Sequence, residues 1–353
     1  MVRLAPSEHY RFAQSCPGTM DLTFGGAESS VAASISMLGG SSRFVSALPQ
    51  HAIADAFVRQ MRGFKVDVDH VLRREAGRFG IYYVETGANQ RPSRVIYDRD
   101  YSAVSICSGE EYDWDAIFAD AQWLHISGIT LAISETAAHA AILAAGKAQA
   151  AGVKVSCDLN FRKNLWRWRS GSDARSLARS VMPDFLEYVN VIIGNEEDAA
   201  DVLDIHAGDT DVHSGSLEIA HYPDVARQIA QRFNNVEQVA ITLRESISAT
   251  HNNWGAMLFD VSNDTAVFAP MNRKQYDPFE IRNIVDRVGG GDSLAAGLIY
   301  AMTTKDFATA QDQVDFAVAA SCLAHSVKGD FNFTSRAEVE ALANGNASGR
   351  VQR

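Results

Sequence analysis

Several familiar signals are missing from this 353-residue sequence, and each absence removes a class of protein. Its four cysteines lack the spacing of a metal site or a disulfide framework, and no apolar run is long enough to cross a membrane. Neither a His-Glu-x-x-His nor a Gly-x-Ser-x-Gly motif is present, which disfavours metalloproteases and serine hydrolases. The 32 Lys and Arg residues against 43 Asp and Glu give a net charge of −11, which disfavours nucleic-acid binding. The start, residues 1–4, lacks the apolar core of a signal peptide, so we expect a cytoplasmic protein without nucleic-acid or membrane partners.

What the sequence does contain, from residue 123 onward, is a regular alternation of strand and helix patterns. The predicted strands are 123–128, 153–158, 191–194 and 239–242, and the predicted helices are 134–151, 174–182, 196–203 and 223–233. Such alternation predicts a parallel sheet covered by helices on both faces. In such folds, ligands bind at the carboxyl ends of the strands.

The most informative stretch lies near the C-terminus. The β-branched run Ile284–Val288 meets the glycines Gly289, Gly290 and Gly291, and Asp292 then begins a run of small and apolar residues at helical spacing. This pattern predicts a strand, a tight loop and a helix that starts at Asp292. The loop is neither a Walker A motif nor a dinucleotide fingerprint.

Three glycines and the first turn of a helix together offer unpaired N–H groups to an anion. A carboxylate beside such an anion site suits phosphoryl transfer, because Asp292 could take the proton from a hydroxyl while the amides stabilise the transferring group. The alternative interpretation is a glycine turn in which Asp292 is an ordinary helix cap.

The stretch Asp286–Ser293 resembles the C-terminal signature of the ribokinase-like (PfkB) carbohydrate kinases, usually Asp-Thr-x-Gly-Ala-Gly-Asp. Arg287 stands at the usual Thr and Gly290 at the usual Ala. Over most of its length the sequence is similar to the 2-keto-3-deoxygluconate kinases. The resemblance implies that Asp292 is the catalytic base, that the three glycines form the anion hole, and that ATP and Mg²⁺ are cofactors. The resemblance does not decide whether a monovalent cation is required.

The resemblance also implies a fold. We expect residues 1–353 to form one ribokinase-like α/β domain, a three-layer sandwich with a central, mostly parallel sheet. A small β lid should come from about residues 1–24 and 78–101. In the family the first strand begins with a Gly-Asp or Gly-Glu pair, whereas Met1–Pro6 resembles only the end of that strand. We therefore expect one acidic contact to the sugar to be absent from this sequence.

Two predicted strands, Phe79–Glu85 and Arg94–Arg99, lie within the expected lid. Alternation places Tyr97 and Arg99 on one face, where guanidinium and phenol groups would suit an anionic polyol. The resemblance implies that Tyr82, Tyr97 and Arg99 contact the substrate. The alternative is an exposed hairpin with solvated arginines.

Three further segments carry substrate residues in the resembling family. Gly26 matches a glycine pair at a helix entry, and Ser30 stands where the family has an Asn that holds sugar hydroxyls; a serine hydroxyl can still bond, with shorter reach. The Asp-x-Asn-x-Arg pattern at 158–162 assigns Arg162 to the sugar carboxylate. Asp330, after a helix predicted at 314–327, matches a sugar-contacting position or is simply a turn residue.

We expect the nucleotide-binding residues near the ends of two predicted strands. Asn195 and Asp198 resemble the Asn-x-x-Glu motif of the family, which handles phosphate and metal; Mg²⁺ usually binds few protein oxygens and keeps waters. The alternative is a set of acids at a helix N-terminus. Thr242 and Arg244 stand where many members have a glycine-containing nucleotide loop, and Arg244 could pair with ATP phosphates.

The sequence therefore predicts an ATP-dependent kinase for the terminal hydroxyl of 2-keto-3-deoxygluconate, and the resemblance implies a homo-oligomer. One alternative is a kinase of the same family acting on a neutral ketose or a nucleoside. Another is a non-catalytic sugar-binding protein. We expect residues 205–221 to form a surface insertion and the tail from Asn344 to be mobile.

Overall fold

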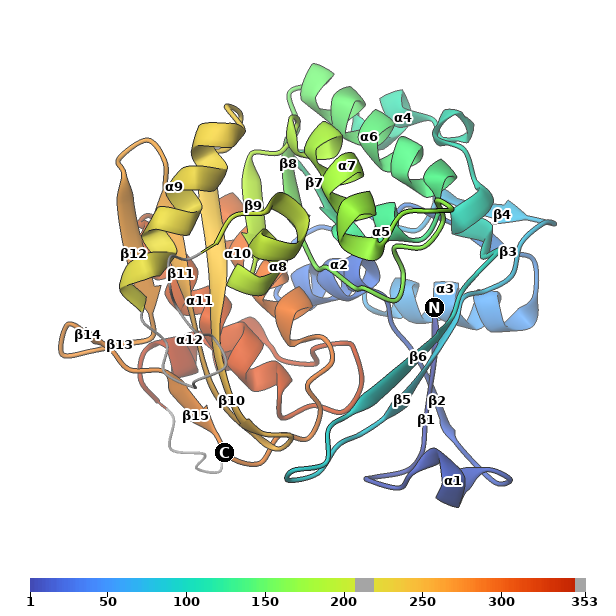
Figure 1. The fold of residues 1–353 in the computed structure, drawn as a ribbon, viewed down its shortest axis with the longest axis horizontal. Coiled ribbons are helices and arrows are strands. Elements are labelled where there is room, and N and C mark those ends of the chain that lie inside the picture. The colour runs from blue at the N-terminus through green and yellow to red at the C-terminus, as the bar shows by residue number, and fades with distance from the viewer. Residues whose placement is uncertain (207–218, 347–353) are drawn as a thin grey trace.

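The computed structural model describes residues 1–206 and 219–346, which contain a seven-stranded central sheet (Figure 1). The strand order is β12-β11-β10-β9-β8-β7, and β15 pairs beside β11. The bounds are β7 Trp123–Ser127, β8 Lys154–Asp158, β9 Val191–Gly194, β10 Gln238–Ser248, β11 His251–Asp260, β12 Thr265–Ala269 and β15 Phe279–Ile281. Strands β7 to β10 are parallel, whereas β11, β12 and β15 pair antiparallel at one side.

Helices cover both faces of this sheet, and each face has its own apolar core. One layer contains α6 Glu135–Ala150, α7 Ala174–Leu186, α8 Glu196–Leu203 and α9 Tyr222–Arg232. The other contains α2 Ala27–Met37, α10 Gly290–Thr303 and α11 Ala310–Ala324, against which α12 Arg336–Ala343 packs. These layers confirm the predicted α/β sandwich with a central, mostly parallel sheet.

A second sheet extends away from the sandwich (Figure 1). Its order is β2-β1-β5-β6, with β1 Val2–Ala5, β2 Asp21–Phe24, β5 Ile81–Glu85 and β6 Arg94–Asp98. Tyr82 lies directly opposite Tyr97 in the antiparallel β5–β6 pair, so the two phenols share one face. All four strands fall in the ranges predicted for the lid. The lid role and the single-domain organisation stay predictions.

The remaining elements are a small parallel strand pair, an antiparallel hairpin of β13 Met271–Asn272 and β14 Gln275–Tyr276, and several short helices. Strands β3 Ser46–Pro49 and β4 Val71–Arg74 form a parallel pair, and α3 Ala52–Gly63 connects them. The short helices are α1 Phe12–Ser15, α4 Trp114–Phe118 and α5 Gly128–Ala132. None of the described helices has the length and apolarity needed to cross a membrane.

Several predicted boundaries were wrong. Ile284–Val288 is irregular rather than a strand, because its backbone bonds go singly to Thr250 and His325 instead of into a ladder. The helix predicted at 314–327 begins at Ala310, since Thr309 and Asp312 form a capping box there. The expected insertion at 205–221 and the expected mobile tail lie largely outside the described residues.

Candidate active site

A cavity of about 1630 Å³ lies where β5 and β6, the carboxyl ends of β8 to β10 and the N-terminus of α10 meet. Residues far apart in the sequence line it together. They are Gly26, Tyr82, Tyr97, Arg99, Arg162, Asn195, Asp198, Thr242, Arg244, Gly289, Gly290, Gly291, Asp292 and Asp330. Ser30 is the one predicted site residue that does not line the cavity; it is buried, and its hydroxyl has no hydrogen-bond partner among the described residues.

The glycine loop is shaped by close approach of other chain segments. Gly289 is the N-cap of α10 with a φ of 86°, and a Cβ there would lie 2.6 Å from the Asp330 carbonyl oxygen. A Cβ on Gly290 would lie 3.0 Å from Cε1 of His325. Side chains at these positions would therefore displace the loop. Because glycine occupies them, the first N–H groups of α10 stay open to the cavity.

Asp292 occupies the first turn of α10 without capping it. The N-cap is Gly289, and the Asp292 carboxylate makes no hydrogen bond to any residue within the described ranges. The helix-cap interpretation of Asp292 is therefore wrong. A carboxylate that faces a cavity beside free helix N–H groups remains available to a ligand.

Acidic groups crowd this part of the cavity and raise one another's pKa. The pKa of Asp292 is raised well above its usual value by burial and by the charges of Asp158, Asp330 and Glu28, against the opposing charge of Arg162. Burial and the neighbouring Asp198 raise the pKa of Asp158 to about 7. Such mutually shifted carboxylates are typical of catalytic sites and of sites that attract cations.

Two of the predicted substrate-binding residues, Arg99 and Arg162, line the same cavity and have unused hydrogen-bond donors among the described residues. Nε of Arg99 is buried and has no partner in the described part of the chain, and burial lowers the pKa of this arginine. Arg162 is exposed and lines the cavity, and among the described residues it donates only to the Phe161 carbonyl oxygen, at 3.0 Å. Two unfilled guanidinium groups are suited to a planar anion such as a carboxylate.

Comparison with known proteins supplies the family. A model of the pfkB family of carbohydrate kinases matches residues 12–336. The chain belongs to this family. It is an enzyme that phosphorylates a carbohydrate alcohol.

Two relatives at 28% and 40% identity, and one further solved structure at 23%, match this kinase over nearly its whole length. The 2-dehydro-3-deoxygalactonokinase of Haloferax volcanii is 28% identical over 349 residues, covering 99% of this chain and 96% of the relative. The crystal structure of 2-dehydro-3-deoxygluconokinase from Thermotoga maritima is 40% identical, with a TM-score of 0.87 and coverage of 98% and 96%. A putative 2-keto-3-deoxygluconate kinase from Enterococcus faecalis, 23% identical with a TM-score of 0.82 and coverage of 100% and 96%, shares the fold.

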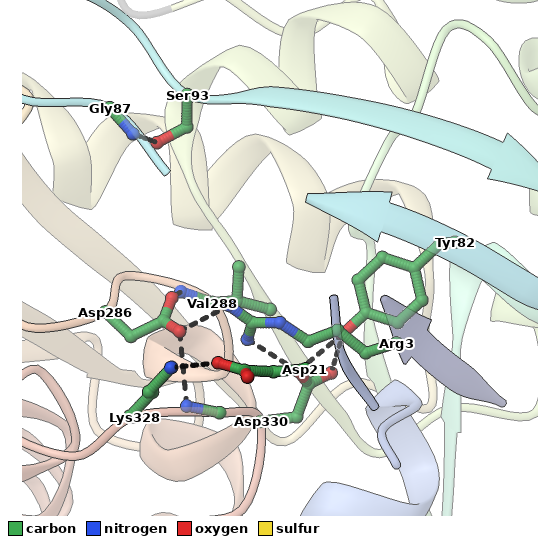
Figure 2. Close-up of polar contacts among 10 residues, drawn as sticks. Arg3, Asp21, Tyr82, Gly87, Ser93, Asp286, Val288, Lys328 and Asp330 are labelled. Atoms are coloured by element: carbon green, nitrogen blue, oxygen red, sulfur yellow. Dashed lines mark hydrogen bonds and ion pairs between the residues drawn. The ribbon is translucent and has the colours of Figure 1, made fainter. Parts of the chain in front are cut away.

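A buried ion network in this kinase ties strands β1 and β5 of the second sheet to the segment before the glycine loop (Figure 2). Arg3 on β1 donates to Asp286 at 2.5 Å and to Asp330 at 3.0 Å, and the Tyr82 hydroxyl donates to Asp330 at 2.5 Å. Asp286 in turn accepts from the backbone N–H of Val288, at 3.1 Å. Asp330 is thus more than a turn residue, since it links segments that lie 248 and 327 residues away.

Arg3 and Asp286 were not among the predicted site residues. The one available signal was an arginine inside the apolar strand-like run Val2–Leu4, because a buried charge in such a run needs a partner. Glu28 was missed as well. Its carboxylate lines the cavity and accepts from the Ser127 N–H at 3.1 Å and the Thr130 hydroxyl at 2.5 Å.

The predicted nucleotide residues lie on regular elements of the kinase. Asn195 is the N-cap of α8, in a capping box with Asp198. Thr242 and Arg244 lie within the long strand β10 rather than in a loop, and the Thr242 hydroxyl donates to the Gly194 carbonyl oxygen at 3.4 Å. Alternation along β10 turns Thr242, Arg244 and Ser246 toward the cavity.

Because residue 25 is a glycine, the Asp330 side chain has room to lie beside it. Substitution of Gly25 is therefore our first test of the ion network. A Cβ on residue 25 would lie 2.0 Å from the Asp330 carboxylate, so Gly25→Ala must displace it from Arg3 and Tyr82. We expect a loss of about 1–3 kcal/mol in the free energy of unfolding, measured by urea denaturation. Gly63→Ala is the matched control, because nothing lies within 4 Å of a Cβ there. Equal stability of the two variants would contradict the tight fit.

Proposed function

We propose that this kinase transfers the terminal phosphoryl group of ATP to the terminal hydroxyl of 2-keto-3-deoxygluconate. The observation that carries the proposal is that Asp292, the glycine loop and two arginines without an ion pair among the described residues, Arg99 and Arg162, line one cavity. A neutral sugar would leave both guanidinium groups without an anionic partner. The names of the two relatives, which denote kinases of a pair of 2-dehydro-3-deoxy sugar acids, support this substrate class.

In the proposed reaction, the residues of this chain bind, orient and deprotonate the acceptor. Asp292 accepts the proton of the attacking hydroxyl, and the N–H groups at Gly289–Gly291 stabilise negative charge on the phosphoryl group as it moves. Arg99 and Arg162 hold the sugar carboxylate, while Tyr97 offers a phenol to the hydroxyls. Closure of the lid strands over the sugar would exclude water, which otherwise competes as an acceptor.

The donor set of the cavity also fits Mg²⁺, which when bound would neutralise charge on the ATP phosphates. Asp158 and Asp198 are the residues that would face the ion, since both are buried carboxylates whose pKa is raised. The Asp198 oxygens already accept from the backbone N–H groups of Phe161, at 2.9 Å, and Asn195, at 3.3 Å. No cluster of three or more acidic, His or Cys side chains that could ligate a metal occurs within the described ranges, so contact through water is the mode that fits.

The shifted pKa of Asp292 predicts the acidic limb of the pH profile. A base works only when ionised, so activity falls as pH decreases through its pKa. Because burial and neighbouring carboxylates raise that pKa, kcat/KM should begin to fall at a higher pH than an ordinary aspartate, near pH 4, would give. The measurement is kcat/KM across the range from about pH 3 to about pH 9. An acidic limb at about pH 4 would contradict a crowded base.

A coupled ADP-release assay tests the function itself. With ATP and Mg²⁺, the panel should contain 2-keto-3-deoxygluconate, its galacto epimer, fructose, ribose and adenosine. Turnover confined to the keto acids would support the proposal. Turnover with a neutral sugar or adenosine would favour the alternative kinase and would contradict the binding of a substrate carboxylate by the two arginines. No turnover with any compound of the panel would favour a sugar-binding protein. The homo-oligomer and the monovalent cation stay predictions, tested by light scattering and by assays with and without K⁺.

A further inference from the structure

Arg287 precedes the glycine loop, at the position where the family signature usually has threonine. Its Nη2 donates to the Ser248 carbonyl oxygen at 3.2 Å and to Oδ1 of Asn252 at 2.8 Å. Its Nε is buried and has no partner among the residues that the structure describes. The side chain lines the cavity. The Arg287 guanidinium is thus held by two neutral acceptors on one edge, and the described residues leave its remaining N–H donors unused.

Arg244 belongs to the same wall of the cavity. It lies directly opposite Trp254 in the β10–β11 pair, and the Trp254 ring lies 5.0 Å from the His325 ring, which packs against Gly290. Arg244 is exposed, and within the described ranges it has neither a hydrogen bond nor an ion pair. Burial, together with the charge of Arg244, lowers the pKa of Arg287, so the two cations repel each other.

The nearby carboxylates do not neutralise this pair. Asp286, the neighbour of Arg287, is paired with Arg3 at 2.5 Å. Glu245 accepts from the Asn253 side chain at 2.6 Å and forms no ion pair with any described residue. Two guanidinium groups beside the N-terminus of α10 therefore form a positive wall without an anion in the protein itself. Keeping such charges partly desolvated is unfavourable until an anion pairs with them.

We propose that Arg287, together with Arg244, binds the phosphate chain of the phosphoryl donor. The inference rests on the proposed function and adds a residue to it. The donor phosphates must lie beside the N–H groups of Gly289–Gly291 for transfer to occur. Arg287 is two residues from that loop, whereas Arg99, which directly follows β6, and Arg162, in the segment after β8, are assigned to the sugar acid. Guanidinium forks match phosphate oxygens in geometry as well as charge.

Inorganic tripolyphosphate is the direct probe, because it carries the phosphate chain without a base or a sugar. Calorimetric titration should show that Arg287→Gln weakens tripolyphosphate binding about tenfold. The KM for ATP should rise by a similar factor, with the KM for the sugar acid unchanged. Arg287→Lys keeps the charge and should recover part of the lost affinity, although a single ammonium group cannot reproduce the planar fork.

Arg282→Gln is the matched control. Arg282 lies five residues earlier in the same segment, is exposed, and pairs with Glu280 at 2.8 Å outside the cavity. It should bind tripolyphosphate like the unmodified kinase.

Three results would overturn the proposal. Unchanged tripolyphosphate affinity with a lowered melting temperature would mean that Arg287 only ties Ser248 and Asn252 in place. A change confined to the KM of the sugar acid would mean that the wall takes the substrate carboxylate. An equal loss of affinity in Arg282→Gln would mean that the effect is one of net charge. The titration needs no turnover, so failure of the keto acid as substrate would disprove the proposed function without changing how the phosphate result is read.

Discussion

Asp292→Asn is expected to lower kcat about 10³-fold while leaving sugar affinity nearly unchanged. The amide keeps the size and position of the side chain but cannot accept the proton of the attacking hydroxyl. Because the Asp292 carboxylate is crowded by Asp158, Asp330 and Glu28, losing its charge should also relieve repulsion. The melting temperature should therefore stay equal or rise. Steady-state kinetics, sugar titration and thermal unfolding together separate loss of a base from loss of folding.

Asp312→Asn provides the control for this substitution. Asp312 is the third residue of α11, as Asp292 is the third residue of α10, but it is exposed and forms a capping box with Thr309. Its replacement should reduce stability slightly and leave kcat unchanged. A near-normal kcat in Asp292→Asn would show that another group accepts the proton. His125 also lines the cavity, but burial lowers its pKa to about 4 and its Nδ1 is engaged with the Ser156 hydroxyl at 2.8 Å.

Arg162→Ala is expected to raise the KM for 2-keto-3-deoxygluconate roughly 10- to 100-fold, because it removes charge-assisted hydrogen bonds to the carboxylate. The KM for a neutral analogue such as the corresponding deoxy ketose should change little. Arg162 also lowers the pKa of Asp292, so the acidic limb of the pH profile should move to higher pH in the variant. Initial rates with both sugars across pH measure these effects together.

Arg167→Ala controls for the loss of a positive charge in the same loop. Arg167 pairs with Asp100 at 2.6 Å on the surface and does not line the cavity. It should behave like the unmodified kinase with both sugars. Equal KM changes for the acid and the neutral sugar in Arg162→Ala would refute the carboxylate role and leave Arg162 as a general electrostatic contributor to the site.

One hydrogen bond joins the β5–β6 hairpin to the β10–β11 hairpin. The backbone N–H of Ala249, at the turn of the β10–β11 hairpin, donates to the Asn89 carbonyl oxygen at the tip of the β5–β6 hairpin, at 2.7 Å. Arg287 holds the same β10–β11 turn through Ser248. The strands that carry Tyr82 and Tyr97 are thereby connected, through two hydrogen bonds, to the proposed donor-phosphate site.

Local patterns determined much of this protein. Alternating strand and helix signals are set by side-chain periodicity, so the parallel sheet from Trp123 onward and its covering helices could be predicted. The glycine loop and the position of Asp292 could also be predicted, because a flexible turn and the start of a helix depend on residues that are neighbours in the sequence. Boundaries were less accurate where long-range contacts decide them, as at Ile284–Val288, which the sequence alone made look like a strand.

Only the tertiary structure decided which distant charges meet. No local signal joins Arg3 to Asp330, which are 327 residues apart, or shows that Asp286 is already neutralised when Arg287 is not. Ser30, placed by pattern beside the sugar, lies outside the cavity lining, because the direction of a helix face depends on what packs against it. The ion pairing, burial and pKa of a side chain depend on its neighbours in three dimensions. The sequence specifies those neighbours only through the folded chain.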